Sequence, residues 1–413
     1  MWKPWRLWVG VVWLLGVAGA PGEAWAKGAP SYCERTPALQ TQLEGLLSMM
    51  GPGKTVLSLV VAGLNRGLAE RCVRLNELQV IGSHNSYHVE PSPELLDLFL
   101  MFDPAAIAWQ YTHPPLAFQF QAQGIRQIEL DVFADPDGGL YADRIALALI
   151  GQDIASNEPE LEEPGFKVLH VQHSDFDTTC LTLVSCLQQV KAWSDANPGH
   201  LPIMVLIEAK DEDFFVPILP PVIRIDAALF RDLDAEIRSV FPDERMILPD
   251  HVRGKHATLE QAVLTTGWPT LQRARGKVLF ALDNGGAKRD QYRDGADSLQ
   301  GRVLFTNSFP GQPDAAFVKL NDPLGDATLI PELVQEGYIV RTRADADTVQ
   351  ARNGDTTMRD AALASGAQFV STDYADPDPR FGTGYTVELP GGVVARCNPV
   401  NGPAYCRDAA IAP

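Results

Sequence analysis

The sequence predicts an α/β fold in which eight parallel strands alternate with helices and close into a (β/α)8 barrel, the TIM barrel architecture. Short apolar segments rich in β-branched residues recur along the chain, and helical patterns lie between several of them. Near-continuous apolar strands separated by helices indicate a parallel sheet, and eight is the number that closes this barrel. A doubly wound open sheet is the alternative, but no glycine-rich fingerprint follows the first strand.

The predicted elements can be placed by residue number. The eight expected strands cover residues 78–83, 126–133, 166–171, 201–210, 277–284, 302–307, 338–345 and 367–373. Amphipathic patterns indicate helices over 180–197, 328–337 and 357–366. The last two patterns end in glycine, as helix C-termini often do.

The barrel is expected to occupy residues 77–376. Residues 1–26 combine basic residues, an apolar stretch and a small-residue pattern ending at Ala26, which predicts a cleaved secretory signal peptide and a secreted or periplasmic protein. Residues 27–76 are expected to form a helical N-terminal extension, and residues 377–413 a tail rich in proline and glycine. No later stretch has eighteen consecutive apolar residues, so we expect no transmembrane span in the mature protein.

Charge and cysteine content narrow the partners and the compartment. A formal net charge of −18 argues against nucleic acid, because phosphates are bound by basic patches. Six cysteines in an exported chain favour disulfides. The preferred pairs are Cys33–Cys72, Cys180–Cys186 and Cys397–Cys406. Because six cysteines allow fifteen pairings, this is a preference, and the oligomeric state is left open.

Polar and charged side chains gather at the predicted C-terminal ends of the strands, where barrel enzymes place their chemistry. Glu129 and Asp131 are two residues apart and therefore on one side of their strand, as are Glu208 and Lys210. The whole set is His84, Asn85, Glu129, Asp131, His170, Glu208, Lys210, Asp283, Arg341, Arg343 and Asp373.

Four of these residues are candidate metal ligands. Asn85, Glu129, Asp131 and Glu208 offer only oxygen atoms and carry three negative charges, which suits calcium or magnesium and not zinc. Carboxylates inside apolar strands are costly unless they are paired or bind a metal. The alternative is a plain ion pair, such as one between Glu208 and Lys210.

The remaining candidates supply acid–base chemistry and positive charge. His84 and His170 carry imidazoles with ordinary pKa values near neutrality, as an acid–base pair requires. Lys210, Arg341 and Arg343 are candidates for binding an anionic substrate group. Together with a metal, these groups predict a site that splits a phosphate ester.

Long motifs in the sequence resemble the secreted, calcium-dependent phosphatidylinositol-specific phospholipase C family of bacteria, which belongs to the phospholipase C-like phosphodiesterases. The resemblance runs from about residue 75 to residue 376. Its motifs are GSHNSYH at 82–88, GIRQIELDVFADPDG at 124–138, the segment 166–211, and AQFVSTDY at 367–374.

The resemblance implies a role for each candidate. His84 and His170 take the positions of the catalytic histidines, and Lys210 becomes a phosphate contact. We assign His84 as general base and His170 as general acid, although the sequence leaves the reverse order open. The calcium positions fall on Asn85, Glu129, Asp131 and Glu208. The extra His173 competes for the second histidine role, and His88 is expected to be structural.

The implied substrate is phosphatidylinositol at a membrane surface, cleaved to diacylglycerol and a cyclic inositol phosphate. Two apolar loops at 95–109 and 214–223 follow strands that end at the site and are candidates for contact with the bilayer. The alternative functions are a glycerophosphodiester or sphingomyelin phosphodiesterase on the same barrel, or an inactive secreted calcium-binding module.

Overall fold

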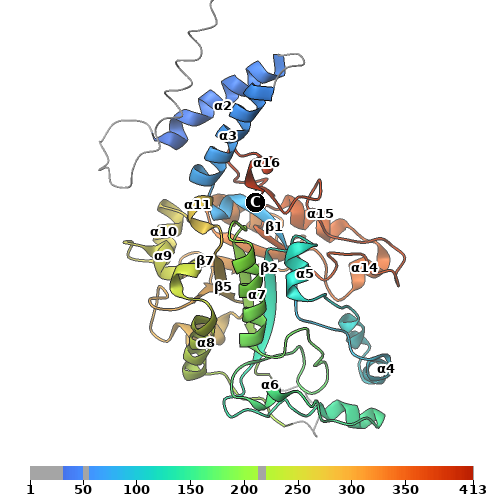
Figure 1. The fold of residues 1–413 in the computed structure, drawn as a ribbon. Helices are drawn as coiled ribbons and strands as arrows, with labels where there is room; N and C mark the ends of the chain where they lie inside the picture. Colours follow the sequence, from blue (N-terminus) through green and yellow to red (C-terminus); the bar gives the residue numbers. More distant parts are fainter. Residues whose placement is uncertain (1–30, 50–54, 213–219, 413) are drawn as a thin grey trace, which may run out of the picture.

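The computed structural model describes residues 31–49, 55–212 and 220–412 and contains the expected barrel (Figure 1). Eight parallel strands follow one another around it, and β1 pairs with both β2 and β9, which closes the sheet. The barrel strands are β1 (Leu78–Ser83), β2 (Gln127–Phe133), β4 (Ile203–Ala209), β5 (Val278–Leu282), β6 (Leu304–Asn307), β7 (Ala315–Lys319), β8 (Ile339–Arg343) and β9 (Phe369–Thr372).

One predicted barrel strand was wrong and another was missed. The segment 166–171 contains only the short β3 (Lys167–Val168), which pairs antiparallel with the last two residues of β2 and lies outside the barrel. The missing barrel strand is β7. Alanine is depleted in strands, and β7 has two alanines and a lysine in five residues, so its apolar signal is weak.

Helices surround the barrel. The patterns at 180–197, 328–337 and 357–366 correspond to α7, α13 and α15. The helices that follow β1 are α4 (Pro93–Phe102), α5 (Leu116–Gln121), α6 (Pro159–Glu162), α7 (Leu183–Ala196), α8 (Ala227–Val240), α9 (Pro249–Arg253), α10 (Leu259–Thr265), α11 (Leu271–Ala274), α12 (Gly286–Arg293), α13 (Leu329–Glu336), α14 (Val349–Asn353) and α15 (Thr357–Ala364). Short 3-10 helices are η1 (Leu75–Glu77), η2 (Pro104–Trp109), η3 (Ile145–Ile150) and η4 (Asp243–Arg245).

Local signals in the sequence set the ends of these helices. The Thr182 hydroxyl accepts a hydrogen bond from the Ser185 N–H at the start of α7, and Asp226 caps α8 by accepting from two backbone N–H groups. Gly337 ends α13 in the left-handed conformation with φ 113°, which favours glycine. The apolar sides of α7 and α8 then join the same core as the barrel strands, whose residues are nearly all buried.

The first two described helices and the last described segment lie at the N-terminal end of the barrel strands. There α2 (Tyr32–Met49) and α3 (Thr55–Cys72) form a hairpin, and the C-terminal β10 (Ala395–Cys397) pairs antiparallel with β1. The short α16 (Asp408–Ile411) contacts α3. The three preferred disulfides, Cys33–Cys72, Cys180–Cys186 and Cys397–Cys406, are all present.

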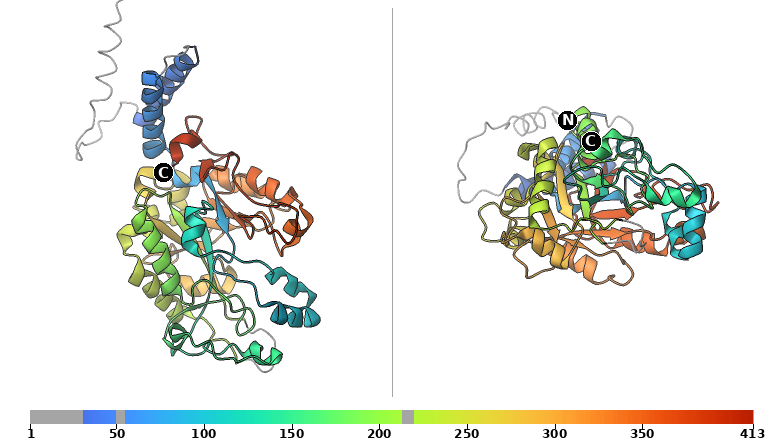
Figure 2. Two further views of the ribbon diagram at one scale, coloured as in Figure 1. Left: turned by 45° about the vertical axis from the view of Figure 1, so that its right-hand side comes forward. Right: turned by 90° about the horizontal axis from the view of Figure 1, so that it is seen from below.

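The two ends of the barrel differ in what they carry. The α2–α3 hairpin extends beyond the N-terminal ends of the strands, whereas α4 and α6 lie at the opposite end, where the strands finish (Figures 1 and 2). Within the described part of the chain, no helix combines the length and the apolar character needed to cross a membrane.

The helix packing gives a stability prediction. Leu233 on α8 is fully buried, so Leu233→Ala should lower the free energy of unfolding by about 2–5 kcal/mol through lost burial and a residual cavity. The matched change Leu264→Ala on α10, where the side chain is 47% exposed, should change it by less than about 0.5 kcal/mol. Urea denaturation measures both, and equal losses would contradict this packing.

Candidate active site

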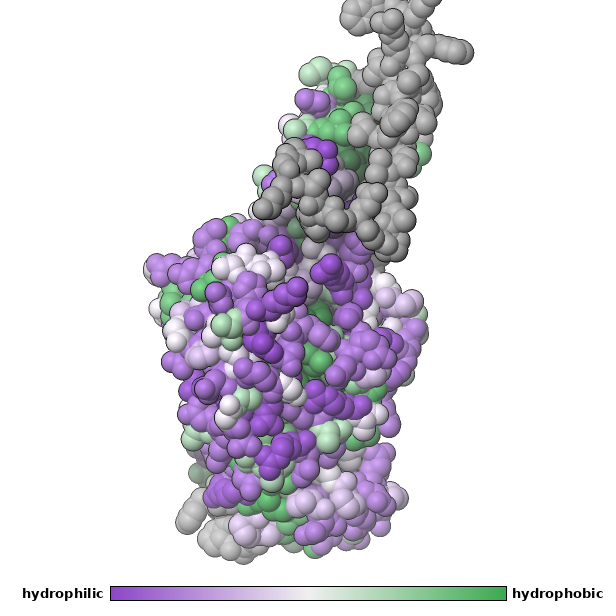
Figure 3. Space-filling model, turned by 90° about the vertical axis from the view of Figure 1, so that its left-hand side faces the viewer, coloured by the Kyte–Doolittle hydropathy of each residue, from purple (hydrophilic) through white to green (hydrophobic). Residues whose placement is uncertain are grey.

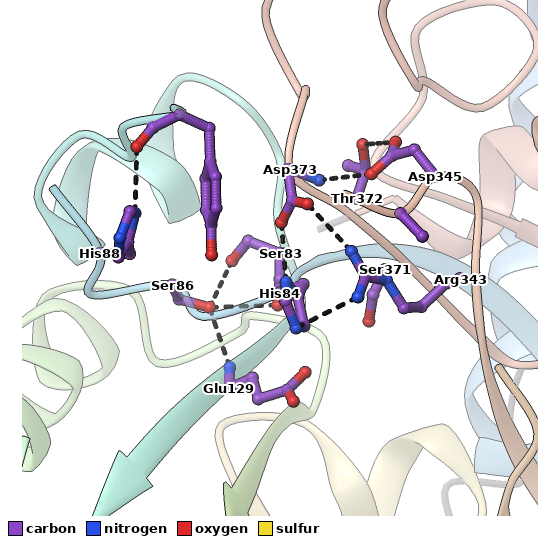
Figure 4. A network of polar contacts seen from close by, with 12 residues as sticks. Ser83, His84, Ser86, His88, Glu129, Arg343, Asp345, Ser371, Thr372 and Asp373 are labelled. Atoms are coloured by element: carbon purple, nitrogen blue, oxygen red, sulfur yellow. Dashed lines mark hydrogen bonds and ion pairs between the residues drawn. The ribbon is translucent and has the colours of Figure 1, made fainter. Parts of the chain in front are cut away.

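A tight turn after β1 presents His84 and Asn85 at the end of the barrel where the strands finish. Asn85 adopts a positive φ of 42°, a left-handed conformation that asparagine tolerates better than most residues, and its carbonyl accepts from the His88 N–H at 2.8 Å. The Ser86 side chain accepts from the Glu129 N–H at 2.8 Å. These bonds tie the turn to β2 (Figure 4).

His84 lies between a carboxylate and a guanidinium (Figure 4). Its Nδ1 donates to Asp373 Oδ1 at 2.8 Å, and its Nε2 accepts from Arg343 Nη1 at 3.3 Å. Arg343 also donates to Asp373 Oδ2 at 2.9 Å. Burial and the charge of Arg343 lower the pKa of His84 to about 3, although Asp373 opposes the shift. The imidazole is therefore neutral at physiological pH, with its Nε2 lone pair directed away from Asp373.

A second carboxylate joins His170 to His88. Asp175 Oδ2 accepts from His170 Nδ1 at 2.7 Å and from His88 Nε2 at 2.9 Å. The other nitrogen of His88 donates to the Tyr111 carbonyl at 3.0 Å. Burial alone lowers the pKa of His88, but the Asp175 carboxylate outweighs it and raises that pKa above its ordinary value. His88 is thus a buried partner of the His170–Asp175 pair as well as a structural residue.

His173, the competitor for the second histidine role, has other partners. Its Nδ1 donates to the Asp143 carbonyl at 2.8 Å, and its ring stacks on Tyr141. His170, in contrast, donates from Nδ1 to the carboxylate of Asp175.

Three carboxylates from β2 and β4 lie close together. Ligand atoms of Glu129, Asp131 and Glu208 lie within 4.8 Å of one another, and β2 and β4 align Asp131 with Glu208. Burial raises the pKa of Asp131 well above its usual range, and the neighbouring carboxylates add to the shift while Lys210 opposes it. Burial also raises the pKa of Glu129 to about 7, against the charge of Arg341.

The oxygen atoms of this cluster fit a hard cation. Both carboxylate oxygens of Asp131 and the Oδ1 of Asn85 are buried without a hydrogen-bond partner. Buried polar atoms normally have partners, and an all-oxygen set with negative charge is the donor set that calcium prefers.

The three predicted cations are placed differently from one another. Lys210 lies at the edge of the cluster, with Nζ 3.5 Å from Asp131 and 3.6 Å from Glu208. Arg343 holds His84 and Asp373, as described above. Arg341 was predicted to contact substrate, but its guanidinium is fully buried in the barrel, where it donates to Glu129, Ser371 and Asn321.

Sequence reasoning assigned no role to Asp373 and did not consider Asp175. Asp373 is separated from His84 by 289 positions, so only barrel closure brings them together. Asp175 follows His170 by five residues, in a turn closed by backbone hydrogen bonds between His170, Val171 and Asp175. An acidic residue five positions after His170 was the sequence signal that could have identified the His170–Asp175 pair.

Comparison with known proteins decides the family. A family model described as "Phosphoinositide phospholipase C, Ca2+-dependent" matches residues 73–399. The chain belongs to this family. The family is one of calcium-dependent enzymes, and the resemblance inferred from the sequence motifs is confirmed.

Solved structures of calcium-dependent phospholipases C are similar to this phosphoinositide phospholipase C family member. A phosphoinositol-specific enzyme from a Pseudomonas species is 17% identical, with 80% of this chain and 96% of that chain covered and a TM-score of 0.48. A phosphatidylinositol-specific enzyme from Streptomyces antibioticus is 18% identical, with 76% and 97% covered and a TM-score of 0.45. A comparison with curated protein sequences finds no match.

The carboxylate cluster gives a prediction for metal binding. Calcium at about 100 times its Kd should raise the free energy of unfolding by about 2.7 kcal/mol, because only the folded site binds it. Asp131→Asn should abolish this gain and, in EDTA, should leave the protein at least as stable as the wild type, since one crowded buried charge is removed.

Thermal unfolding with calcium and with EDTA measures both effects. Asp297→Asn, at an exposed carboxylate on the barrel surface, is the matched control and should keep the calcium-induced gain. If Asp131→Asn keeps the full calcium-induced gain in stability, Asp131 is not a metal ligand.

Proposed function

We propose that this chain is a phospholipase C that cleaves phosphatidylinositol to diacylglycerol and a cyclic inositol phosphate. The observation that carries the proposal is that His84 and His170 each have a carboxylate on Nδ1, in a barrel that also holds a cluster of three carboxylates. A carboxylate on one imidazole nitrogen fixes the tautomer and leaves the other nitrogen for proton transfer. Two such pairs supply a base and an acid for a single phosphoryl transfer.

His84 is proposed as the general base. Its proton lies on Nδ1, against Asp373, so Nε2 can take the proton of an inositol hydroxyl as that oxygen attacks the neighbouring phosphorus. Arg343, which contacts the same Nε2, lies where its guanidinium can bind the substrate's anionic group. Asp345 accepts from the Asp373 N–H at 2.9 Å and so keeps the carboxylate in place (Figure 4).

His170 is proposed as the general acid, which protonates the departing diacylglycerol oxygen. Asp175 stabilises the charged imidazole, and His88 keeps that carboxylate in position from the opposite side. Trp109 lies edge-on to the His170 ring, with the ring centres 6.1 Å apart. His170 therefore has an aromatic wall on one side and a carboxylate on another.

Asn85, Glu129, Asp131 and Glu208 are the residues that would hold the calcium ion. When bound, calcium supplies positive charge that stabilises the charge on the phosphate oxygens. Arg341 is proposed to hold Glu129 in place from inside the barrel instead of contacting substrate. Lys210, which is partly exposed beside the cluster, is proposed to bind the phosphate.

We propose that α4 and the neighbouring 3-10 helices contact the lipid surface. They form a small apolar cluster separate from the barrel core, and Trp109 connects it to His170. Met101 and Phe102 at the end of α4 are 82% and 77% exposed, and Leu149 on η3 is also exposed. These apolar side chains lie at the same end of the barrel as the site.

The other apolar loop, 214–223, falls mainly on residues 213–219, which are outside the described part of the chain. The side chains predicted from that loop to enter the bilayer are Phe214, Phe215, Ile218 and Leu219. The predicted signal peptide at residues 1–26 also lies outside the described residues. Three disulfides support an exported protein, because such bonds persist in oxidising compartments.

The histidine assignment is tested by substitution. His84→Ala and His170→Ala should each lower the rate of calcium-dependent phosphatidylinositol cleavage by about 10²–10⁴-fold, the usual contribution of an acid or base. His251→Ala, at an exposed histidine of α9, is the control and should retain full activity. Full activity in either test variant would refute its catalytic role. Product analysis separates the alternatives, because a glycerophosphodiesterase or sphingomyelinase would release no diacylglycerol from phosphatidylinositol.

The lipid contact is tested with a double variant of α4. Met101→Ser with Phe102→Ser should weaken binding to phosphatidylinositol-containing vesicles at least about 10-fold. Each change removes a side chain whose full burial contributes roughly 1.5–3 kcal/mol to the binding free energy. Cleavage of a soluble inositol phosphate ester should be unchanged. Phe309→Ser, at an exposed phenylalanine after β6, should have no effect on either. Unchanged vesicle binding in the double variant would exclude α4 as a lipid contact.

A further inference from the structure

The half of the α2–α3 hairpin farthest from the barrel has no covering within the described part of the chain. The hairpin extends from the end of the barrel opposite to the candidate active site (Figure 2). It lies outside residues 73–399, the part that matches the phospholipase family. Its function therefore need not be that of the catalytic barrel.

The outer half of this hairpin is apolar and almost without charge. Leu46, Met49, Val56 and Leu59 are 51%, 83%, 64% and 68% exposed. The only charged residue from position 45 to position 65 is Lys54, which is outside the described residues. Figure 3 shows hydrophobic colouring on the hairpin above a barrel face that is mostly hydrophilic. Helices that are apolar on their outer sides are normally buried against a partner.

Two glycines in the hairpin indicate what kind of partner. Gly45 and Gly63 lie inside α2 and α3, and a Cβ added to either would meet no atom within 4 Å. Glycine inside a helix costs about 1 kcal/mol relative to alanine. Among the described residues, no contact needs these two positions to be small. Gly67 differs, because a Cβ there would lie 2.7 Å from the Tyr32 hydroxyl. Open glycines permit the backbone of another helix to approach closely.

The base of the hairpin is held firmly. The Cys33–Cys72 disulfide joins its two helices, and Glu44 pairs with Arg407 at 2.7 Å. The side chain of Gln40 donates to the Tyr405 carbonyl at 3.0 Å. The hairpin therefore presents a fixed surface.

We propose that the α2–α3 hairpin is a dimerisation element that packs against the same hairpin of a second copy, as a four-helix bundle. An apolar surface without charge is complementary to itself, as a two-fold interface requires. The outer halves of the two helices, about nine residues each, are roughly 14 Å long and roughly 20 Å wide together, or about 270 Å² in flat projection. This area is below the approximately 800 Å² per partner of a standard interface, so we expect a weak dimer.

A lipid bilayer is the less suitable partner for two reasons. Lipid chains adapt to any side chain and do not require glycine, whereas a closely packed helix does. The hairpin and the candidate active site also lie at opposite ends of the barrel, so a bilayer that covered one would not reach the other (Figure 1).

The proposal is tested by sedimentation velocity on the mature full-length protein between about 1 µM and about 100 µM, the range where an interface of modest size is partly occupied. The wild type should shift from monomer to dimer. Leu59→Glu should raise the dimer Kd at least about 30-fold by placing a charge at the interface. Leu264→Glu, an equally drastic change at an exposed leucine of α10, should leave the Kd unchanged.

Gly63→Leu distinguishes close helix packing from insertion into lipid. It should weaken the dimer although the surface becomes more apolar, whereas insertion into phosphatidylcholine vesicles should strengthen. A wild type that stays monomeric throughout, or vesicle binding that Leu59→Glu abolishes and Gly63→Leu enhances, would overturn the proposal. Because the readout is oligomeric state, the result is independent of whether the proposed phospholipase activity is correct.

Discussion

The mutual repulsion of three clustered carboxylates, two of them buried, is the constraint on which the site depends. Glu129, Asp131 and Glu208 come from two neighbouring strands and lie within 4.8 Å of one another, with Glu129 and Asp131 buried and Glu208 partly exposed. Such a cluster is unfavourable unless positive charge compensates for it. Arg341 neutralises part of the charge from inside the barrel and Lys210 part from its edge. The oxygens that remain without partners are where a divalent cation would complete the balance.

The two histidines are held beside this cluster by different means. His84 depends on long-range closure, because its partners Asp373 and Arg343 belong to the last barrel strands and reach β1 only when the sheet closes. His170 depends on a local turn, and Asp175 in that turn is shared with His88 from the opposite side. Loss of barrel closure would therefore separate His84 from Asp373 before it separates His170 from Asp175.

The barrel also separates two apolar surfaces. One lies on α4 and η3, beside the candidate site, and the other on the α2–α3 hairpin at the far end. In an acidic chain, patches of this kind are exposed for a reason, since monomeric soluble proteins keep large apolar patches covered. Because the two surfaces lie at opposite ends of the barrel, we propose different partners for them: the lipid surface for α4, and a second hairpin for α2 and α3.

Much of the molecule followed from sequence alone, because periodicity, spacing and motif carry local information. The apolar runs predicted a parallel eight-stranded barrel. The short spacing within two cysteine pairs favoured the three disulfides that the structure contains. The two-residue spacing of Glu129 and Asp131 placed both on one side of β2. The motifs around His84 and His170 identified the family that the comparison then confirmed.

Only the tertiary structure decided which of these groups pair. β3 was expected in the barrel but lies outside it, and β7, which was not expected, is a barrel strand, because strand membership depends on partners across the sheet and not on the apolar run itself. Arg341 points into the barrel, although its charge alone could not distinguish it from Arg343. Asp373 became a partner of His84 through a contact between segments whose separation no periodicity records, whereas Asp175 meets His170 within one local turn. Sequence pattern determined the chemical groups and the strands that carry them, and closure of the barrel determined which of those groups meet.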